Sequence, residues 1–126
     1  MSQNQHRIIP IFASNGDVEA FLVFPHLFNR SGEWIGWVTP RRDVYSVMGF
    51  FVGTLSDDAR IVRRRGEGDS RPRLKPPSRP VKIATPSTVP LAPLMSDLPL
   101  SLIDVLQDEP ERLHTADSGE FREDMD

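Results

Sequence analysis

The chain has 126 residues, of which 38% are hydrophobic and 26% are charged, and its formal net charge is −3. It contains no cysteine, which excludes disulfides and is typical of a reducing compartment. No apolar run is long enough to span a bilayer, and the first residues lack the basic and apolar pattern of a secretion signal. We therefore expect a cytoplasmic protein without a membrane span.

Composition divides the chain into two parts. Nine of the ten aromatic residues lie between Phe12 and Phe51, whereas eight of the twelve prolines lie between Pro72 and Pro99. We therefore expect one folded domain at residues 7–66. A domain of this size buries only a modest fraction of its surface, so it needs tight aromatic packing or a partner.

A repeated frame organises this first part. It consists of an apolar pair, three residues, a Gly, three more residues and a small residue, and it recurs at steps of 16 and 17 residues. The copies are Ile11-Phe12, Gly16 and Ala20; Leu27-Phe28, Gly32 and Gly36; Val44-Tyr45, Gly49 and Gly53; and Ile61-Val62, Gly66 and Ser70. Each copy predicts a short β-hairpin with the Gly in its turn, most strongly at Asn15-Gly16.

Alternation along the second strands predicts which side chains are buried, because neighbouring residues of a strand face opposite ways. Equivalent positions on one face are apolar or small: Val18, Trp34 and Phe51; Ala20, Gly36 and Gly53; Leu22, Val38 and Leu55. The small residues indicate close packing near a pseudo-fourfold axis. On the other face, Phe21 and Trp37 are expected to be only partly covered.

The fourth copy is degraded. Its second strand would hold Gly68, Ser70 and Pro72, none of which can cover a core. We therefore expect an open edge at this hairpin, closed by Leu74 or by an external chain.

The segments IFASNGDVEAFL (residues 11–22) and LFNRSGEWIGWV (residues 27–38) resemble the hairpin unit of the 4-fold β-flower family of small bacterial proteins. The resemblance implies four short hairpins around a pseudo-fourfold axis, followed by a Pro-rich tail. The pattern Gly-x-x-Ile-Gly-x-Val at residues 32–38 is also similar to PRC-barrel adaptor domains. Neither family supplies a catalytic residue, and the chain departs from the β-flower pattern in its fourth copy and its acidic end.

Residues 67–99 form a Pro-rich basic linker, predicted to be extended and close to polyproline II. It contains more aliphatic side chains than a spacer needs, so we expect it to lie along a surface of its own domain or of another protein. These side chains are Leu74, Val81, Ile83, Val89, Leu91, Leu94 and Leu98. A plain flexible spacer is the alternative interpretation.

A short amphipathic helix is predicted at residues 100–107, capped by Ser96-Asp97 and ended by Pro110. Its apolar stripe consists of Leu98, Leu102, Val105 and Leu106. Such a short helix is marginal alone. It therefore either docks in a groove of a partner or packs back onto the hairpin domain. Residues 108–126 follow as a solvated acidic tail with a local charge of −6.

No constellation for catalysis is present in the sequence. His6, His26 and His114 are scattered without metal-ligand spacing, and Asp57-Asp58 is typical of a turn. We therefore expect no enzyme activity, cofactor or metal. The strongest polar feature is residues 60–82, where nine basic residues against two acidic ones give a local charge of +7.

These patterns favour a non-catalytic adaptor, an accessory subunit whose extended tail docks on a larger protein complex. The residues expected to contact that partner are Phe21, Trp37, Leu98, Leu102, Val105 and Leu106. The alternative is a nucleic-acid-associated protein that neutralises phosphates through its basic segment. Its contacts would be Arg63, Arg64, Arg65, Arg71, Arg73 and Lys75, in a segment without aromatic side chains for base stacking.

Overall fold

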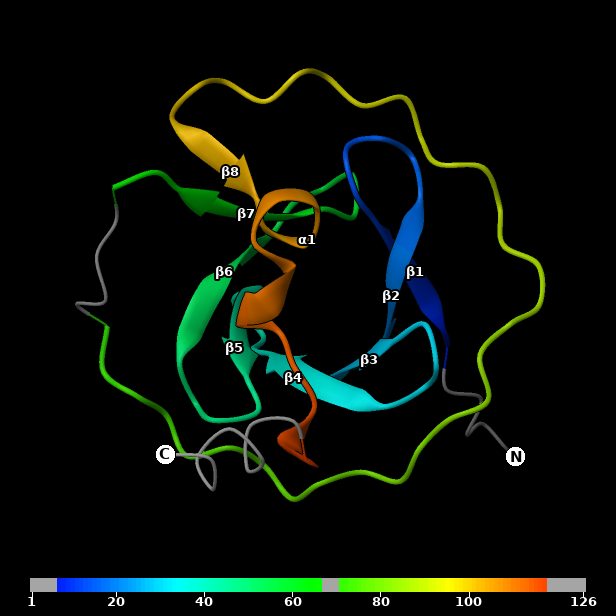
Figure 1. Cartoon of the computed structure of the whole chain (residues 1–126), viewed down its shortest axis with the longest axis vertical. Coiled ribbons are helices and arrows are strands. Elements are labelled where there is room, and N and C mark those ends of the chain that lie inside the picture. The colour runs from blue at the N-terminus through cyan, green and yellow to red at the C-terminus, as the bar shows by residue number, and fades with distance from the viewer. Residues whose placement is uncertain (1–6, 67–70, 118–126) are drawn as a thin grey trace.

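The computed structural model describes residues 7–66 and 71–117, which form a single sheet of eight antiparallel strands in chain order. The strands are β1 (Ile9–Phe12), β2 (Val18–Val23), β3 (His26–Asn29), β4 (Trp34–Val38), β5 (Asp43–Ser46), β6 (Phe51–Leu55), β7 (Ile61–Arg64) and β8 (Leu102–Asp104). One short helix, α1 (Val105–Asp108), and a 3-10 turn, η1 (Pro110–Arg112), follow. The sheet curls around a central axis (Figure 1). The prediction of an all-β fold with one short helix near the C-terminus is confirmed.

The first three hairpins turn where the sequence predicts. Gly16, Gly32 and Gly49 lie in their turns with φ of 95°, 84° and 91°, a conformation that residues with a Cβ rarely adopt. In each turn the glycine N–H donates to the carbonyl three residues earlier, as from Gly16 to Ala13 at 2.9 Å. The first strand of each hairpin also carries a register shift at the same place, between its apolar pair.

The fourth hairpin is closed by the chain itself, which corrects the expected open edge. Strand β7 pairs with β8, with Val62 opposite Asp104 and Arg64 opposite Leu102. Neither Leu74 nor an external chain takes this place. An unpaired strand edge leaves backbone donors and acceptors without partners, and a distant segment of the same chain satisfies them here.

The predicted helix over residues 100–107 is accordingly wrong in its bounds. Residues 102–104 are extended in β8, and the helix covers only Val105–Asp108. Its N-cap is Asp104, whose side chain accepts a hydrogen bond from the Gln107 N–H, and not Ser96-Asp97. Pairing with β7 outweighs the weak helical preference of so short a segment.

Residues 71–100, which we call the strap, join the two strands of this fourth hairpin. They contain no helix or strand and run around the outside of the sheet (Figure 1). The sheet therefore takes its last strand from beyond the strap, although the sequence placed the hairpin domain within residues 7–66.

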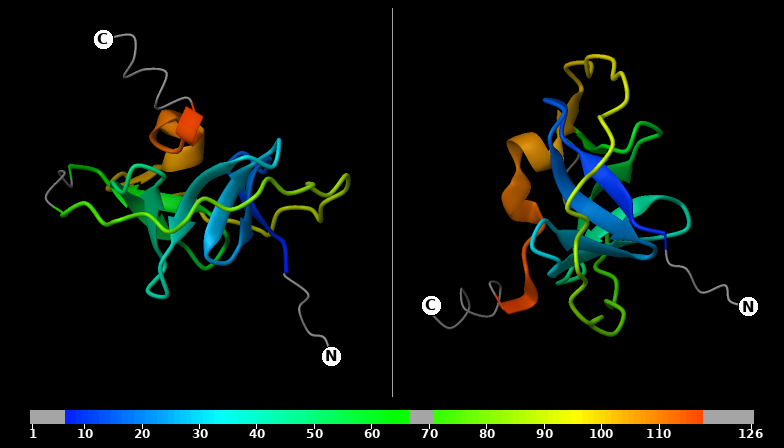
Figure 2. Two further views of the ribbon diagram at one scale, coloured as in Figure 1. Left: turned by 90° about the horizontal axis from the view of Figure 1, so that it is seen from below. Right: turned by 90° about the vertical axis from the view of Figure 1, so that its right-hand side faces the viewer.

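The apolar core lies inside the curl of the sheet. Fully buried aliphatic side chains come from successive hairpins, among them Ile11, Leu27, Val44 and Ile61. Helix α1 and the segment after it cover one end of this core with Val105, Leu106 and Leu113. Figure 2 shows α1 on one face of the sheet and the start of β1 on the other.

The outer face of the sheet is more completely covered than the alternation predicts. Phe21 is only 4% exposed and Trp37 only 7% exposed. Trp37 stacks on Tyr45 with ring centroids 5.3 Å apart, and Tyr45 meets the ring of Phe51 edge-on. Phe51 therefore lies in this outer layer, and its predicted place on the inner face is wrong; its neighbour Val52 is in the core instead. Strap residues add to this layer, since the guanidinium of Arg71 lies 3.9 Å from the centroid of the Phe51 ring.

Candidate protein-binding strap

The first half of the strap, residues 71–83, is clasped to the sheet at two hairpin turns. The Leu74 N–H donates to the Gly49 carbonyl, and the Ile83 N–H donates to the Gly32 carbonyl, both at 3.0 Å. A Cβ on Gly49 or Gly32 would overlap the carbonyl oxygen of the facing strap residue. Glycine is therefore required at these turns for the close approach of the strap as well as for the positive φ. We call residues 71–83 the clasped half.

Two arginines reinforce this attachment. Arg71 forms an ion pair with Asp43 at 3.2 Å, in addition to its contact with Phe51. Burial by itself would lower the pKa of Arg71, but a hydrogen bond with Tyr45 and the charge of Asp43 raise it overall. Arg73 lies 4.6 Å from the centroid of the Phe50 ring and donates to the Met48 carbonyl at 2.7 Å.

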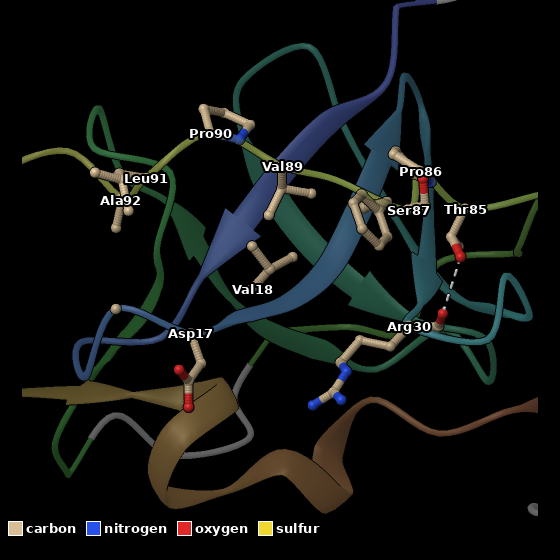
Figure 3. A pocket seen from close by; sticks show the side chains of 12 residues that line it. Asp17, Val18, Arg30, Thr85, Pro86, Ser87, Val89, Pro90, Leu91 and Ala92 are labelled. Carbon is tan, nitrogen blue, oxygen red and sulfur yellow. Dashed lines mark hydrogen bonds between the residues drawn. The ribbon is translucent and has the colours of Figure 1, made fainter.

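The second half of the strap, residues 84–100, is held differently, and we call it the free half. Its first contact is the Thr85 hydroxyl, which donates to the Arg30 carbonyl at 3.2 Å (Figure 3). Within residues 7–66 and 71–117, no backbone hydrogen bond joins residues 84–98 to the hairpin of β1 and β2. A Cβ on Gly16 would meet nothing within 4 Å, in contrast to the other two turn glycines.

A cavity of about 630 Å³ separates the free half from the first hairpin. Asp17, Val18 and Arg30 line it from the sheet side, and Thr85, Val89 and Ala92 are among the strap residues that face it (Figure 3). The strap bonds to the third hairpin turn at Leu74 and to the second at Ile83, nine residues later. A further nine residues would place Ala92 at the first turn, but no strap atom lies close to Gly16.

The far end of the free half is fastened by arginines of the fourth hairpin. Arg60 donates to the Ser96 carbonyl at 3.0 Å, and Arg65 donates from Nε to the Leu100 carbonyl at 2.9 Å. Arg60 is buried and pairs with Asp58 at 2.7 Å. The hydrogen bond from Arg60 is the main reason why the pKa of Asp58 lies below its usual value.

A buried polar cluster links this end of the strap to the first hairpin. Arg60 donates to the Ser14 hydroxyl at 2.9 Å, and that hydroxyl donates to Asp104 at 2.6 Å. The Asp104 carboxylate also accepts from the Ser14 N–H at 2.6 Å and from the Gln107 N–H at 3.2 Å. The tip of the first hairpin is thus tied to β8 and α1, and its Asn15 N–H is likewise taken by Gln107 at 3.0 Å.

The last ten residues of the free half, 91–100, expose their side chains with a period of three. Ala92, Met95 and Leu98 are partly buried, whereas the two residues between each of them and the next are exposed. Leu91 is 95% exposed and Leu94 is 103% exposed, so neither side chain packs on the chain's own surface. A period of three residues is that of polyproline II. The clasped half has the same inward period at Pro77, Pro80 and Ile83.

The residues predicted to contact a partner lie mostly inside the chain. Phe21, Trp37, Val105 and Leu106 are buried, and Leu98 and Leu102 are partly buried. The placement of Val105 and Leu106 favours the alternative in which the helix packs back onto its own hairpin domain. The exposed apolar surface lies instead on the free half of the strap, where Leu91 borders the open cavity and Leu94 is fully exposed, and their spacing of three residues is the signal that the sequence analysis missed.

The predicted phosphate-binding residues are largely engaged with the chain's own groups. Arg63 pairs with Glu109 at 3.2 Å. Burial opposes ionisation of Glu109, but hydrogen bonds from Arg63 and Arg112 outweigh it, so the pKa of Glu109 is lowered. Arg65, Arg71 and Arg73 make the strap contacts described above, and Arg64 and Lys75 are exposed.

A second cavity, of about 530 Å³, is lined mainly by apolar side chains of the core. Ile9, Leu22, Val38 and Leu55 line it, and the half-exposed Phe24 belongs to its lining.

Two ring nitrogens elsewhere, Nδ1 of His26 and Nε1 of Trp34, are buried without a hydrogen-bond partner among the described residues. Burial lowers the pKa of His26.

In the described parts of the chain, no three His, Asp or Glu side chains are grouped closely enough to hold a metal ion. Nor do those parts contain a helix with the length and apolarity needed to cross a membrane. His6 lies outside the described residues.

The chain matches no family model, and comparisons with curated proteins and with solved structures give no match either.

Proposed function

We propose that this chain is a non-catalytic protein-interaction module, an accessory subunit that docks on a larger protein complex through the exposed leucines on the free half of its strap. The observation that carries this proposal is the exposure of Leu91 and Leu94, whose side chains contact almost nothing of their own chain. Burying one such side chain in an interface contributes roughly 1.5–3 kcal/mol. Two exposed leucines three residues apart can therefore contribute much of the binding energy from a small area.

The attachment of the strap at both ends supports the same function. Hydrogen bonds at Gly49 and Gly32 hold the clasped half, and Arg60 and Arg65 hold the far end. A segment that is already ordered loses less conformational entropy on binding than a flexible tail does. Docking on a rigid strap is therefore more favourable than docking on a plain spacer of the same sequence.

We also propose that the sheet is a pseudo-fourfold β-flower of four hairpin repeats, with β8 completing the fourth. Recurring features support this: a register shift in the first strand of three hairpins, and positive-φ glycines at 16, 32, 49 and 66. On this proposal the sheet is a scaffold, and the strap that surrounds it presents the binding surface. We propose a cytoplasmic location as well, because a chain without cysteine is typical of a reducing compartment.

The test is affinity capture with the full chain, followed by measurement of Kd for any purified partner. We expect the double variant Leu91→Asp and Leu94→Asp to weaken binding at least tenfold while the free energy of unfolding stays within about 0.5 kcal/mol, because both side chains are exposed. The matched control is Ser87→Asp with Thr88→Asp, which adds the same charge to exposed positions of the free half.

Two outcomes would overturn the proposal. One is a wild-type chain that captures no protein reproducibly. The other is a leucine variant that binds as tightly as wild type. Binding to nucleic acid that falls steeply with salt and is lost when Arg63, Arg64 and Arg65 become Ala would indicate the phosphate-binding function in its place.

A further inference from the structure

We propose that the free half is a polyproline II ligand, with Pro90-Leu91-Ala92-Pro93-Leu94 docking into an aromatic-lined groove of a partner protein. This inference rests on the proposed protein-binding function and names the class of partner. Grooves lined by aromatic side chains bind Pro-x-x-Pro segments in this conformation. The segment supplies that spacing at Pro90 and Pro93.

The inference rests on which side chains of the segment face the sheet and which are exposed to solvent. A polyproline II helix has three residues per turn, so it presents three edges along its length. One edge, containing Ala92 and Met95, is partly buried on the side of the sheet. The other two edges hold Pro90 with Pro93 and Leu91 with Leu94, all exposed, and Pro90 and Leu91 also border the open cavity. A groove can therefore receive two adjacent edges while the third stays on the chain's own surface.

The sequence also restricts the segment to this conformation. Each proline ring holds its own φ near −65°, and it disfavours the helical region for the residue before it. Val89 and Ala92 are therefore biased towards extended backbone by Pro90 and Pro93. Contacts at Thr85 on one side and Ser96 on the other fix the ends of the segment. The cavity behind it leaves the segment free of backbone hydrogen bonds to the first hairpin.

The distribution of charge along the strap indicates that the partner's groove is apolar. Residues 84–95 carry no charged side chain, whereas the clasped half carries Arg71, Arg73, Lys75, Arg79 and Lys82. Recognition of the free half therefore depends on apolar contacts with aromatic rings, and its affinity should change little with salt.

The chain contains its own control motif. Pro77 and Pro80 have the same Pro-x-x-Pro spacing in the clasped half, but both are partly buried on the inward edge. That motif cannot offer its prolines to a groove while the strap is clasped. If accessibility decides recognition, only the second motif binds.

The experiment titrates the full chain against purified SH3, WW and EVH1 domains, as probes of aromatic-lined grooves, and against any partner recovered by capture. We expect saturable binding to at least one probe domain. Pro90→Ala with Pro93→Ala, which keeps both leucines, should weaken binding at least tenfold. Pro77→Ala with Pro80→Ala should change Kd less than twofold. Circular dichroism and urea unfolding of each variant show that the sheet is intact.

The outcomes separate this inference from the proposed function. If the Pro90 and Pro93 variant binds the captured partner like wild type while the Leu91 and Leu94 variant does not, protein binding stands and the groove is refuted. Failure to bind any probe domain at about 1 mM, or an equal loss in the Pro77 and Pro80 variant, also overturns the inference. Failure of the wild-type chain to capture any partner overturns the proposed function.

Discussion

The clasped and free halves of the strap have similar Pro-rich compositions and run along the same sheet, yet only the first is bonded to hairpin turns. The clasped half meets turns whose glycine carbonyls accept its N–H groups, and its arginines stack on Phe50 and Phe51. At the first hairpin the Ser14 and Asn15 N–H groups donate to Asp104 and Gln107, and no N–H of residues 84–98 bonds to the turn. Hairpin turns of similar shape therefore bond to different distant segments, and the half of the strap that is not bonded to a turn keeps Leu91 and Leu94 exposed.

The largest expected effect concerns the cluster that occupies the tip of the first hairpin. Asp104→Ala removes the acceptor of hydrogen bonds from Ser14 and Gln107 inside a buried site next to Arg60. We expect the free energy of unfolding in urea to fall by roughly 3–5 kcal/mol, because the Ser14 N–H, the Ser14 hydroxyl and the Gln107 N–H lose their carboxylate acceptor inside a buried site. Asp97→Ala, an exposed change at the same end of the strap, should cost less than about 0.5 kcal/mol. A loss below about 1 kcal/mol for Asp104→Ala would contradict the role given to this cluster.

The next effect compares turn glycines that lie beneath the strap with one that does not. Gly32→Ala and Gly49→Ala should each cost roughly 2–4 kcal/mol, because the new Cβ is strained at positive φ and also meets the strap backbone. Gly16→Ala has the same φ strain without a strap contact and should cost only about 1–2 kcal/mol. Hydrogen exchange at the Leu74 and Ile83 amides should accelerate in the first two variants. Equal exchange in all three would show that the clasps do not hold the strap.

A smaller effect distinguishes the arginine contacts of the clasped half. Arg71→Ala should cost about 1 kcal/mol, since it removes a cation–π contact with Phe51 and a partly exposed ion pair with Asp43. Part of this loss should disappear at 1 M salt, where the ion pair is screened. Lys75→Ala, in the same exposed stretch, is the control and should leave unfolding unchanged. An Arg71 variant as stable as this control would leave backbone hydrogen bonds as the main attachment.

The smallest expected effect is a pH dependence from two carboxyl groups that pair with arginines, Asp58 beside the far end of the strap and Glu109 after α1. The Arg60 hydrogen bond lowers the pKa of Asp58, and hydrogen bonds from Arg63 and Arg112 lower that of Glu109 against the effect of burial. A carboxyl group with a lower pKa in the folded state stabilises the fold above its unfolded pKa, and this contribution is lost as the pH falls through the folded value. Stability should therefore decrease below about pH 4. Asp58→Asn and Glu109→Gln should flatten this decrease in urea unfolding between pH 2 and 6, and an unchanged slope in both would refute it.

Local rules in the sequence account for the hairpins. The turns at Gly16, Gly32 and Gly49 follow from the need for positive φ, and the buried apolar pairs follow from the repeated frame. Such features depend on residues within one unit of about 17 positions. They were therefore predictable without knowledge of the rest of the chain.

Only the tertiary structure decided how the fourth hairpin closes and which side of the strap is free. Val62 and Asp104 pair although the whole strap lies between them in the sequence. The short run at Leu102 is compatible with a helix or a strand, and it becomes a strand because it pairs with the edge of β7. Phe21 faces strap residues such as Val89 that are distant in sequence, and the exposure of Leu91 and Leu94 depends on which edge of the strap meets the sheet. Sequence periodicity determines the local shape of a segment, whereas the surfaces that remain open depend on which distant segments pack against them or hydrogen-bond to them.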